Sequence, residues 1–271
     1  MRCETVGVQL ALLALFLVVA VLLVVRAANR ERRDYRRFKR LKTTRERQFV
    51  FAKWLRESFL IFGGIAVAVL LASWGEIGPA SASALAWPPL AALHHTFSGP
   101  TGATLGWTLG AVFIIAMVLP VLLLRSRLTE VPAIGDIGSL LPRARGELKY
   151  GALLSLNAGV MEELLFRLGM PALLYGIIGN GVLAFVAASV LFGLLHLYQK
   201  FWGVLGATVL GLGFSLVYLL TGSIWVVIVV HALIDLRSLI LIPVVVLGVN
   251  RVDEVPTAKP TATATADSTD D

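Results

Sequence analysis

The 271-residue sequence contains few charged residues. Only 15% of the residues are Asp, Glu, Lys or Arg, whereas 57% are apolar. A soluble domain usually carries about 25% charged residues, so this chain has too few to cover a globule in water. The apolar residues are also gathered into runs near the roughly 20 residues that a helix needs to cross a bilayer. The composition therefore excludes an ordinary soluble domain and predicts an integral membrane protein.

Cysteine is scarce as well. The single residue, Cys3, excludes an internal disulfide and any metal site with several cysteine ligands. It also lies too close to the N-terminus to be the expected nucleophile. The first apolar run, 6–25, is longer than the core of a cleavable signal, and its positive charge follows the run. We interpret it as a retained first helix with its N-terminus outside.

Positive charge is concentrated in one segment, where 13 of the 24 Lys and Arg residues lie between Arg26 and Arg56. Such a patch could bind nucleic acid. Because it lies between two apolar spans, we favour a cytoplasmic anchor on anionic lipid headgroups and expect no nucleic-acid partner. The loop 125–148 is also basic, so both segments are predicted to be cytoplasmic and the loop 75–105 to be outside the cell membrane.

Hydropathy predicts an all-α, polytopic bundle of transmembrane helices. About seven spans are expected, at 6–25, 58–74, 106–124, 149–169, 182–198, 203–221 and 223–249. The last span contains Asp235, Arg237 and Pro243, so it is either one long helix or a broken pair, and the count is seven or eight. The loop 75–105 is expected to be irregular. The tail 251–271 is rich in Thr, Ala, Pro and Asp and is predicted to be disordered.

The chain divides into four expected parts. They are an N-terminal helix with a basic linker (1–57), two further spans with loops (58–147), a catalytic membrane domain (148–250) and the tail (251–271). Two stripes of small residues at helical spacing predict close helix packing: Gly203, Ala207, Gly211 and Ser215, and Gly151, Ser155 and Gly159, the latter running on to Glu163. The pair His94–His95 has no acidic or cysteine neighbour and is interpreted as surface histidines.

Ionisable residues in the C-terminal spans fall into three short patterns. Groups of this kind within a membrane are costly and indicate a functional site by default. The first pattern is EELLFR at 162–167. Glu163 and Arg167 lie one turn apart on the same face and can pair. This pairing would leave Glu162, about 100° round the helix, available for another role.

The second pattern, FGLLH, places His196 one turn after Phe192, and the third, HALID, puts His231 and Asp235 on one face. A glutamate, two histidines and an aspartate suffice for hydrolysis by water. The glutamate can act as general base, a histidine can share the water, and the remaining pair can stabilise the oxyanion. Two histidines and Glu162 could instead bind zinc with an open position.

The three patterns, in this order, resemble the motifs of the CAAX-protease and bacteriocin-processing (CPBP) family of intramembrane proteases, which includes the type II CAAX prenyl endopeptidase. The resemblance covers about 145–250. It implies an endopeptidase in which Glu162 activates water with the help of His196, while His231 and Asp235 stabilise the oxyanion. It also implies a metal-free glutamate mechanism without a cofactor, with zinc at Glu162, His196 and His231 as the alternative, and a membrane-associated peptide or protein substrate.

The resemblance further implies that Glu163, Arg167 and Phe192 brace the site. The chain departs from the family at Asp235, where the eukaryotic enzymes have Asn, because an ionised Asp cannot donate a hydrogen bond. The loop after EELLFR is apolar here, although it is often basic in the family. Two other functions stay open. One is a transporter or proton relay, for which no inverted repeat is visible, and the other is a catalytically silent scaffold of the same fold.

Overall fold

A computed structural model describes residues 2–124 and 138–253, which form helices and turns without a strand. This confirms the all-α class. The helices are α1 (Arg2–Val25), α2 (Arg32–Phe38), α3 (Thr44–Ser73), α4 (Ile77–Leu85), α5 (Pro88–Phe97), α6 (Gly99–Leu124), α7 (Arg145–Glu163), α8 (Met170–Ile178), α9 (Gly181–Leu194), α10 (Lys200–Thr221), α11 (Ile224–Leu236) and α12 (Ile242–Val245). The predicted disorder of the tail concerns residues 254–271, which lie outside the described residues. Residues 125–137 of the basic loop 125–148 also lie outside them.

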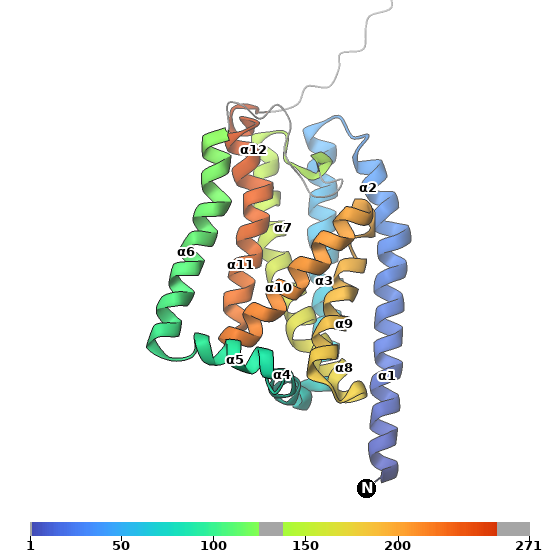
Figure 1. The fold of residues 1–271 in the computed structure, drawn as a ribbon. Helices are drawn as coiled ribbons and strands as arrows, with labels where there is room; N and C mark the ends of the chain where they lie inside the picture. The colour runs from blue at the N-terminus through green and yellow to red at the C-terminus, as the bar shows by residue number, and fades with distance from the viewer. Residues whose placement is uncertain (1, 125–137, 254–271) are drawn as a thin grey trace, which may run out of the picture.

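Five helical segments of the described chain are long and apolar enough to cross a membrane. They are Val6–Phe38, Thr44–Leu85, Gly99–Leu123, Leu197–Thr221 and Ile224–Val245. The expected spans 149–169 and 182–198 are helical too, but they do not belong to this set, and α9 has only 14 residues. The chain is therefore a polytopic helical membrane protein. In Figure 1, α1 stands at one edge of the bundle and α6 at the other, with α3, α7 and α11 between them.

The last apolar segment is one continuous helical stretch. Its two α-helices are joined by a π-helical turn, Arg237–Leu241. A proline ring clashes with the carbonyl four residues earlier in an α-helix, and for Pro243 that residue is Leu239, within the π turn. A second π turn, Leu164–Gly169, likewise precedes Pro171. The wider turn accommodates each proline without ending the helix, so the broken-pair alternative is wrong.

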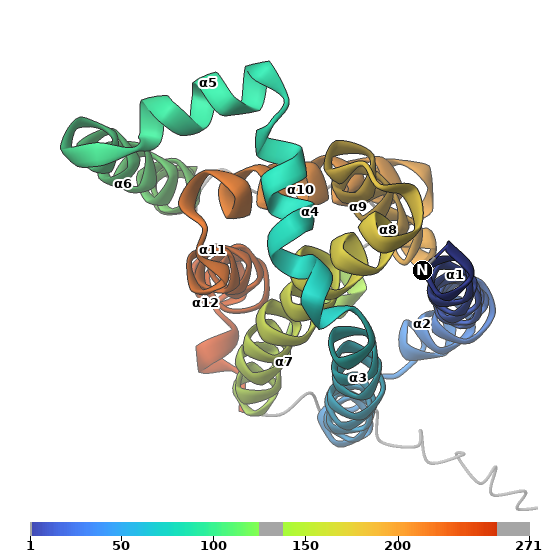
Figure 2. The same ribbon diagram turned by 90° about the horizontal axis from the view of Figure 1, so that it is seen from below.

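The expectation of an irregular loop at 75–105 is wrong as well. This segment forms a 3₁₀ turn at Trp74–Glu76, then α4, α5 and the start of α6. Alanine is the best helix former, and the prolines that open α5 occupy its first turn, where they are tolerated. Figure 2 shows α4 and α5 running across the lower end of the bundle. His94 and His95 lie in the last turn of α5.

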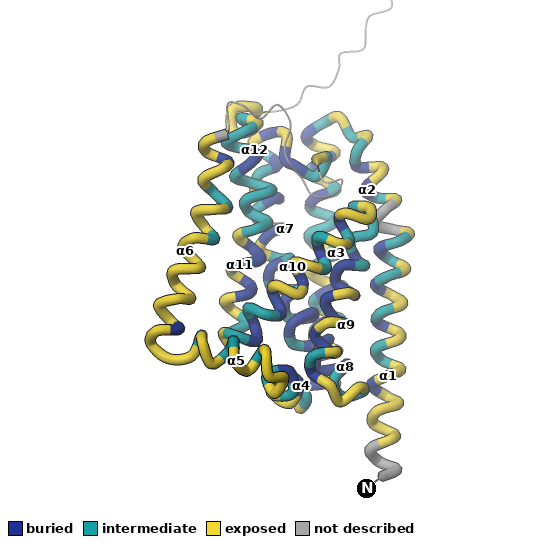
Figure 3. Tube along the Cα trace, in the orientation of Figure 1, coloured by how far each residue is buried: buried dark blue, intermediate teal, exposed yellow. Residues whose placement is uncertain are grey.

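Helix α6 stands apart from the other helices and is exposed along much of its length (Figure 3). One polar contact ties it to the end of α11, because Arg237 Nε donates a hydrogen bond of 2.8 Å to the carbonyl of Met117. Pro120 lies in the following turn of α6 and removes one helical donor there. The charge of Arg237 is therefore explained by this tie between helices.

Both predicted stripes of small residues are buried. On α7 the buried positions recur every fourth residue: Glu147, Gly151, Ser155, Gly159 and Glu163. A Cβ at Gly159 would lie 3.0 Å from the carbonyl oxygen of Ile228 on α11. On α10, a Cβ at Gly211 would meet α9 at Ser189 and Phe192. Small residues thus bring α7 against α11 and α10 against α9, as glycine stripes do in membranes.

One residue of the basic N-terminal segment, Arg47, lies inside the protein. Arg47 is fully buried, and its Nε lies 3.0 Å from the carboxylate of Glu147. Its guanidinium also donates to the carbonyls of Ser139 and Leu141 and lies 4.4 Å from the Phe38 ring centre. The interpretation of the segment as a lipid anchor is therefore wrong for Arg47, because its charge is neutralised within the protein.

Candidate functional site

The two adjacent glutamates of α7 face different surroundings. Glu163 is fully buried, and its Oε2 lies 3.0 Å from Arg167 Nε, so the predicted ion pair is present. Glu162 instead lines a cavity, and Glu163 does not. Consecutive helical residues point about 100° apart, which accounts for this division.

Glu163 has a second partner that the sequence did not reveal. Its Oε1 lies 2.5 Å from Nδ1 of His231 on α11. The two residues are 68 positions apart, and no local spacing predicts their contact. One carboxylate thus holds both Arg167 and His231, and it fixes the orientation of the imidazole relative to α7.

The guanidinium of Arg167 lies between two aromatic rings. Its central carbon is 4.9 Å from the ring centre of Phe192 and 5.1 Å from that of Phe214. Cations at such distances are attracted by the faces of aromatic rings, most strongly when water is excluded. Arg167 Nη2 also contacts the carbonyl of Gly211 at 3.5 Å. Phe214 was not among the predicted residues, because an isolated phenylalanine in an apolar helix gives no signal.

His196 is fixed by the helix that precedes it. Its Nδ1 lies 3.0 Å from the carbonyl oxygen of Phe192, at the end of α9. A carbonyl can only accept, so the proton of this bond is on Nδ1, and Nε2 of the neutral ring is an acceptor. The ring also stacks on Tyr198, with the ring centres 6.1 Å apart.

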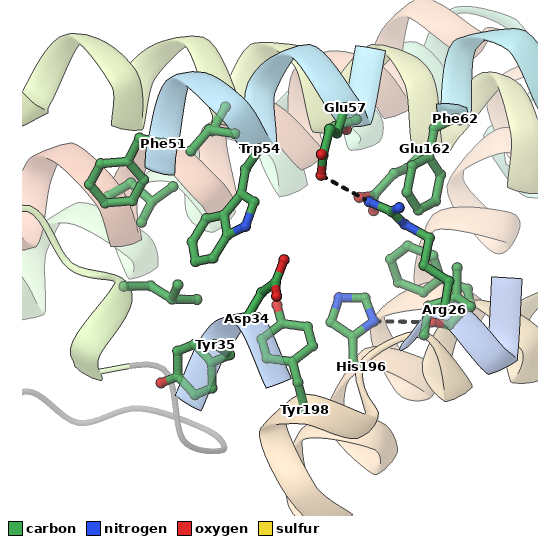
Figure 4. Close-up of a pocket in the computed structure, with 16 residues that line it drawn as sticks. Arg26, Asp34, Tyr35, Phe51, Trp54, Glu57, Phe62, Glu162, His196 and Tyr198 are labelled. Atoms are coloured by element: carbon green, nitrogen blue, oxygen red, sulfur yellow. Dashed lines mark hydrogen bonds and ion pairs between the residues drawn. The ribbon is translucent and has the colours of Figure 1, made fainter. Parts of the chain in front are cut away.

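Glu162 and His196 line the same cavity, which has a volume of about 230 Å³ (Figure 4). Most of its wall is apolar or aromatic. The lining residues are Arg26, Asp34, Tyr35, Phe51, Trp54, Glu57, Ser58, Phe62, Leu140, Leu154, Glu162, Phe192, Leu195, His196, Tyr198 and Leu239. Half of them come from the segment 26–62, which the sequence motifs do not include.

His231 and Asp235 do not line this cavity. As the spacing predicts, they share one face of α11, with His231 Nε2 3.7 Å from Asp235 Oδ2. That distance exceeds a hydrogen bond, and the Asp235 side chain is 34% exposed. The ring of Phe192 lies 5.0 Å from that of His196 and 6.2 Å from that of His231, measured between ring centres. The four predicted catalytic side chains are therefore brought to one region, but only Glu162 and His196 reach the cavity.

The π turns adjoin this region. Arg26 begins one of them, Arg26–Glu31, and lines the cavity. Leu239 of the turn Arg237–Leu241 also lines it, and Glu162 lies two residues before the turn Leu164–Gly169. Single π turns occur frequently at functional sites, and here two of the described π turns each supply one residue to the cavity that contains Glu162.

The described side chains do not fit a metal ion. Within 2–124 and 138–253, no three or more His, Cys, Asp or Glu side chains are grouped so that they could hold one. The alternative zinc set is divided, because Glu162 and His196 line the cavity whereas Nδ1 of His231 is engaged by Glu163. These side chains do not form a zinc site as they stand.

The fold and the site define a helical membrane protein with a cluster of ionisable residues buried between α7, α9 and α11. Residues 145–237 match the family model described as "Type II CAAX prenyl endopeptidase Rce1-like". The match contains all three motifs and confirms the resemblance predicted from them. No curated protein and no solved structure matched the chain. This part of the chain is therefore similar to a family of membrane proteases, whereas ten of the 16 residues that line the cavity lie outside the match.

Proposed function

We propose that the protein is an intramembrane endopeptidase that hydrolyses peptide bonds in the cavity beside Glu162. One observation carries this proposal. Glu162 and His196 line a common cavity, whereas the neighbouring Glu163 is engaged by Arg167 and His231. Glu162 can therefore contact a reactant, whereas Glu163 holds Arg167 and His231 in place.

In the proposed reaction, a water molecule lies between the Glu162 carboxylate and Nε2 of His196. Glu162 takes one proton from the water while the water oxygen bonds to the peptide carbonyl carbon. His196 accepts a hydrogen bond from the second proton of the water. The carbon–nitrogen bond then breaks, and the proton held by Glu162 passes to the departing nitrogen. The products are a new carboxyl terminus and a new amino terminus.

His231 is the proposed donor to the oxyanion. A doubly protonated ring would keep its Nδ1–H on Glu163 and present its Nε2–H to the negative oxygen. Asp235, 3.7 Å from that nitrogen, would favour the charged ring. Glu163 and Arg167 would act through His231 as positioning residues, and Phe192 would hold both Arg167 and His196.

The remaining expectations fit this scheme as proposals. The substrate is a membrane-associated peptide or protein, and no metal or other cofactor takes part. The catalytic region is 148–250, with a wall supplied by 26–62. The basic segment 26–56 and the loop 125–148 face the cytoplasm, where exposed basic residues meet anionic headgroups of the cell membrane.

The test uses the purified full-length protein in vesicles, supplied with peptides from a digest of membrane proteins in ¹⁸O-labelled water. Wild-type protein should produce new carboxyl termini that carry ¹⁸O, and Glu162→Gln should produce none while remaining folded. The control is Glu46→Gln. Glu46 is exposed and takes part in the capping box at the start of α3, and glutamine can take the same part. Cleavage by Glu162→Gln at the wild-type rate would remove Glu162 from the reaction. Absence of cleavage by the wild type, with solute flux across the vesicles, would favour a transporter.

A further inference from the structure

The segment that precedes α7 supplies one residue to the wall of the candidate catalytic cavity. Leu140 ends the 3₁₀ turn Gly138–Leu140 and lines the same cavity as Glu162. It lies before the matched segment 145–237, so the family resemblance assigns no role to it. The contacts that hold this segment in place therefore bear on the shape of the cavity.

The carbonyls on either side of Leu140 are both bound by Arg47 of α3. Nη2 of Arg47 donates a hydrogen bond of 2.9 Å to the carbonyl of Leu141, and Nη1 donates one of 3.2 Å to the carbonyl of Ser139. Nε of Arg47 donates to the carboxylate of Glu147 at 3.0 Å. A guanidinium carries its N–H donors in a planar fork, and this fork joins α3 to the segment before α7 and to α7 itself.

These contacts are buried and suit an arginine in particular. Arg47 and Glu147 are both fully buried, and the same carboxylate accepts a hydrogen bond of 3.0 Å from the backbone N–H of Arg143. The guanidinium carbon of Arg47 also lies 4.4 Å and 5.5 Å from the ring centres of Phe38 and Phe51, and Phe51 lines the cavity. A lysine would keep the charge but lacks the fork. Arg47 thus fixes two parts of the cavity wall relative to each other.

The segment held by Arg47 lies at the end of the cavity away from Glu162. Arg47 is one turn before Phe51, the first residue of α3 that lines the cavity. The level of Glu162 is marked by Gly63, where a Cβ would lie 3.2 Å from Sδ of Met161. Figure 4 shows Phe51 and Glu162 on opposite sides of the cavity. The helix rises about 18 Å between these levels, a length that about five residues of an extended peptide cover.

We propose that Arg47 is a positioning residue that holds Leu140 at the far end of the cavity and thereby limits the size of the substrate side chain accepted there. This inference rests on the proposed peptidase function. The side chain concerned lies several residues from the cleaved bond. Without the fork of Arg47, the segment 138–143 can move away from α3, and a larger side chain can enter. The effect is on binding rather than on the reaction at Glu162, so it appears in KM more than in kcat.

The test uses the peptide that the wild type cleaves best in the digest of membrane proteins. It is synthesised with Ala, Leu or Trp at each position in turn, and the full-length protein in vesicles is assayed with each form. At one position several residues from the cleaved bond, Trp should lower kcat/KM by about tenfold or more relative to Leu, because one methylene in an apolar pocket changes it by about 10–200-fold. Leu140→Ala should remove most of this difference.

Arg47→Met should reduce the same Trp-to-Leu difference, chiefly by lowering KM for the Trp form. Because Arg47 acts through Leu140, adding Arg47→Met to Leu140→Ala should change the ratio no further. Arg47→Lys should reduce the difference less, and it serves if the methionine variant fails to fold. The matched control is Arg45→Met, which removes an exposed arginine from the same turn of α3. It should preserve the wild-type ratio.

A second measurement follows the segment without a substrate. In a Cys3→Ser background, Leu141→Cys places a thiol at a position that is only 4% exposed. A small thiol reagent should modify this cysteine about 10–150-fold faster when Arg47→Met is added, because losing a hydrogen bond to a charged group shifts a local opening equilibrium by about that factor. Equal rates with and without Arg47→Met would show that Arg47 does not hold the segment, and would overturn the inference.

A purely structural role for Arg47 would lower cleavage of all peptide forms by the same factor and leave the Trp-to-Leu ratio as in the wild type. That result in Arg47→Met, with cleavage still dependent on Glu162, would overturn this inference alone. A wild-type ratio at every position in Leu140→Ala would overturn it as well. Absence of any Glu162-dependent cleavage of the digest would instead refute the proposed function, and the inference with it.

Discussion

Arg167 offers the sharpest test of how the site is held together. Its side chain is 1% exposed, its Nε lies 3.0 Å from Glu163, and its guanidinium carbon lies 4.9 Å and 5.1 Å from two phenylalanine ring centres. Arg167→Met keeps much of the side-chain length and removes the charge. Among the described residues, the buried carboxylate of Glu163 would then retain His231 as its one ion-pair partner.

The expected loss of stability follows from the loss of the arginine partner of this buried carboxylate. Removing one member of a buried ion pair costs about 3–5 kcal/mol in soluble proteins, and the lost contacts with the aromatic rings add to it. With roughly 2–4 °C per kcal/mol for proteins of 150–250 residues, Tm should fall by about 6–20 °C. Thermal unfolding of the purified protein in detergent measures this change, and cleavage of the digest below the transition measures activity.

A double variant separates the charge from the packing. Arg167→Met with Glu163→Leu removes both members of the pair, and such replacements by apolar residues are often neutral. Most of the lost stability should return. Cleavage should stay low, because Nδ1 of His231 would have lost its acceptor. An Arg167→Met variant with the wild-type Tm would refute the reasoning, since the loss of the arginine partner of buried Glu163 could not then be costly.

Three further predictions concern the mechanism, the topology and the packing. Asp235→Asn should keep substantial activity and resist chelation, because Asn keeps the shape of the side chain and the carboxylate of Glu163 still holds Nδ1 of His231. If Asp235→Asn is inactive, and if zinc restores the chelated wild type, the glutamate mechanism is refuted, since a lost metal-orienting carboxylate typically costs about 10–100-fold. In a Cys3→Ser background, an impermeant thiol reagent added outside should label a cysteine at exposed Ser98 but not at exposed Lys42, and the reverse pattern would invert the topology. Gly159→Ala should lower Tm and cleavage together, because the new Cβ would lie 3.0 Å from a backbone carbonyl of α11. The expected loss of stability is about 1–3 kcal/mol. A variant with the Tm and cleavage of the wild type would show that α7 and α11 need not pack so closely.

The sequence alone determined the class of protein and the local pairs of the site. Long apolar runs require a membrane wherever they lie in the fold. Helical spacing places residues four apart on one face, so the contact of Glu163 with Arg167 and the shared face of His231 and Asp235 could be predicted. The prediction of an irregular loop at 75–105 was wrong. Alanine-rich stretches with prolines in the first turn still form helices.

Only the tertiary structure decided how these local pairs combine. The contact of Glu163 with His231 joins residues 68 positions apart, and that of Arg47 with Glu147 joins residues 100 positions apart. Such contacts depend on which helices become neighbours, and hydropathy carries no information about that choice. The same packing brought Arg26, from a segment interpreted as a lipid anchor, into the cavity that contains Glu162. A charged side chain in a membrane protein can face lipid headgroups, a buried partner or a cavity, and only the neighbouring helices determine which.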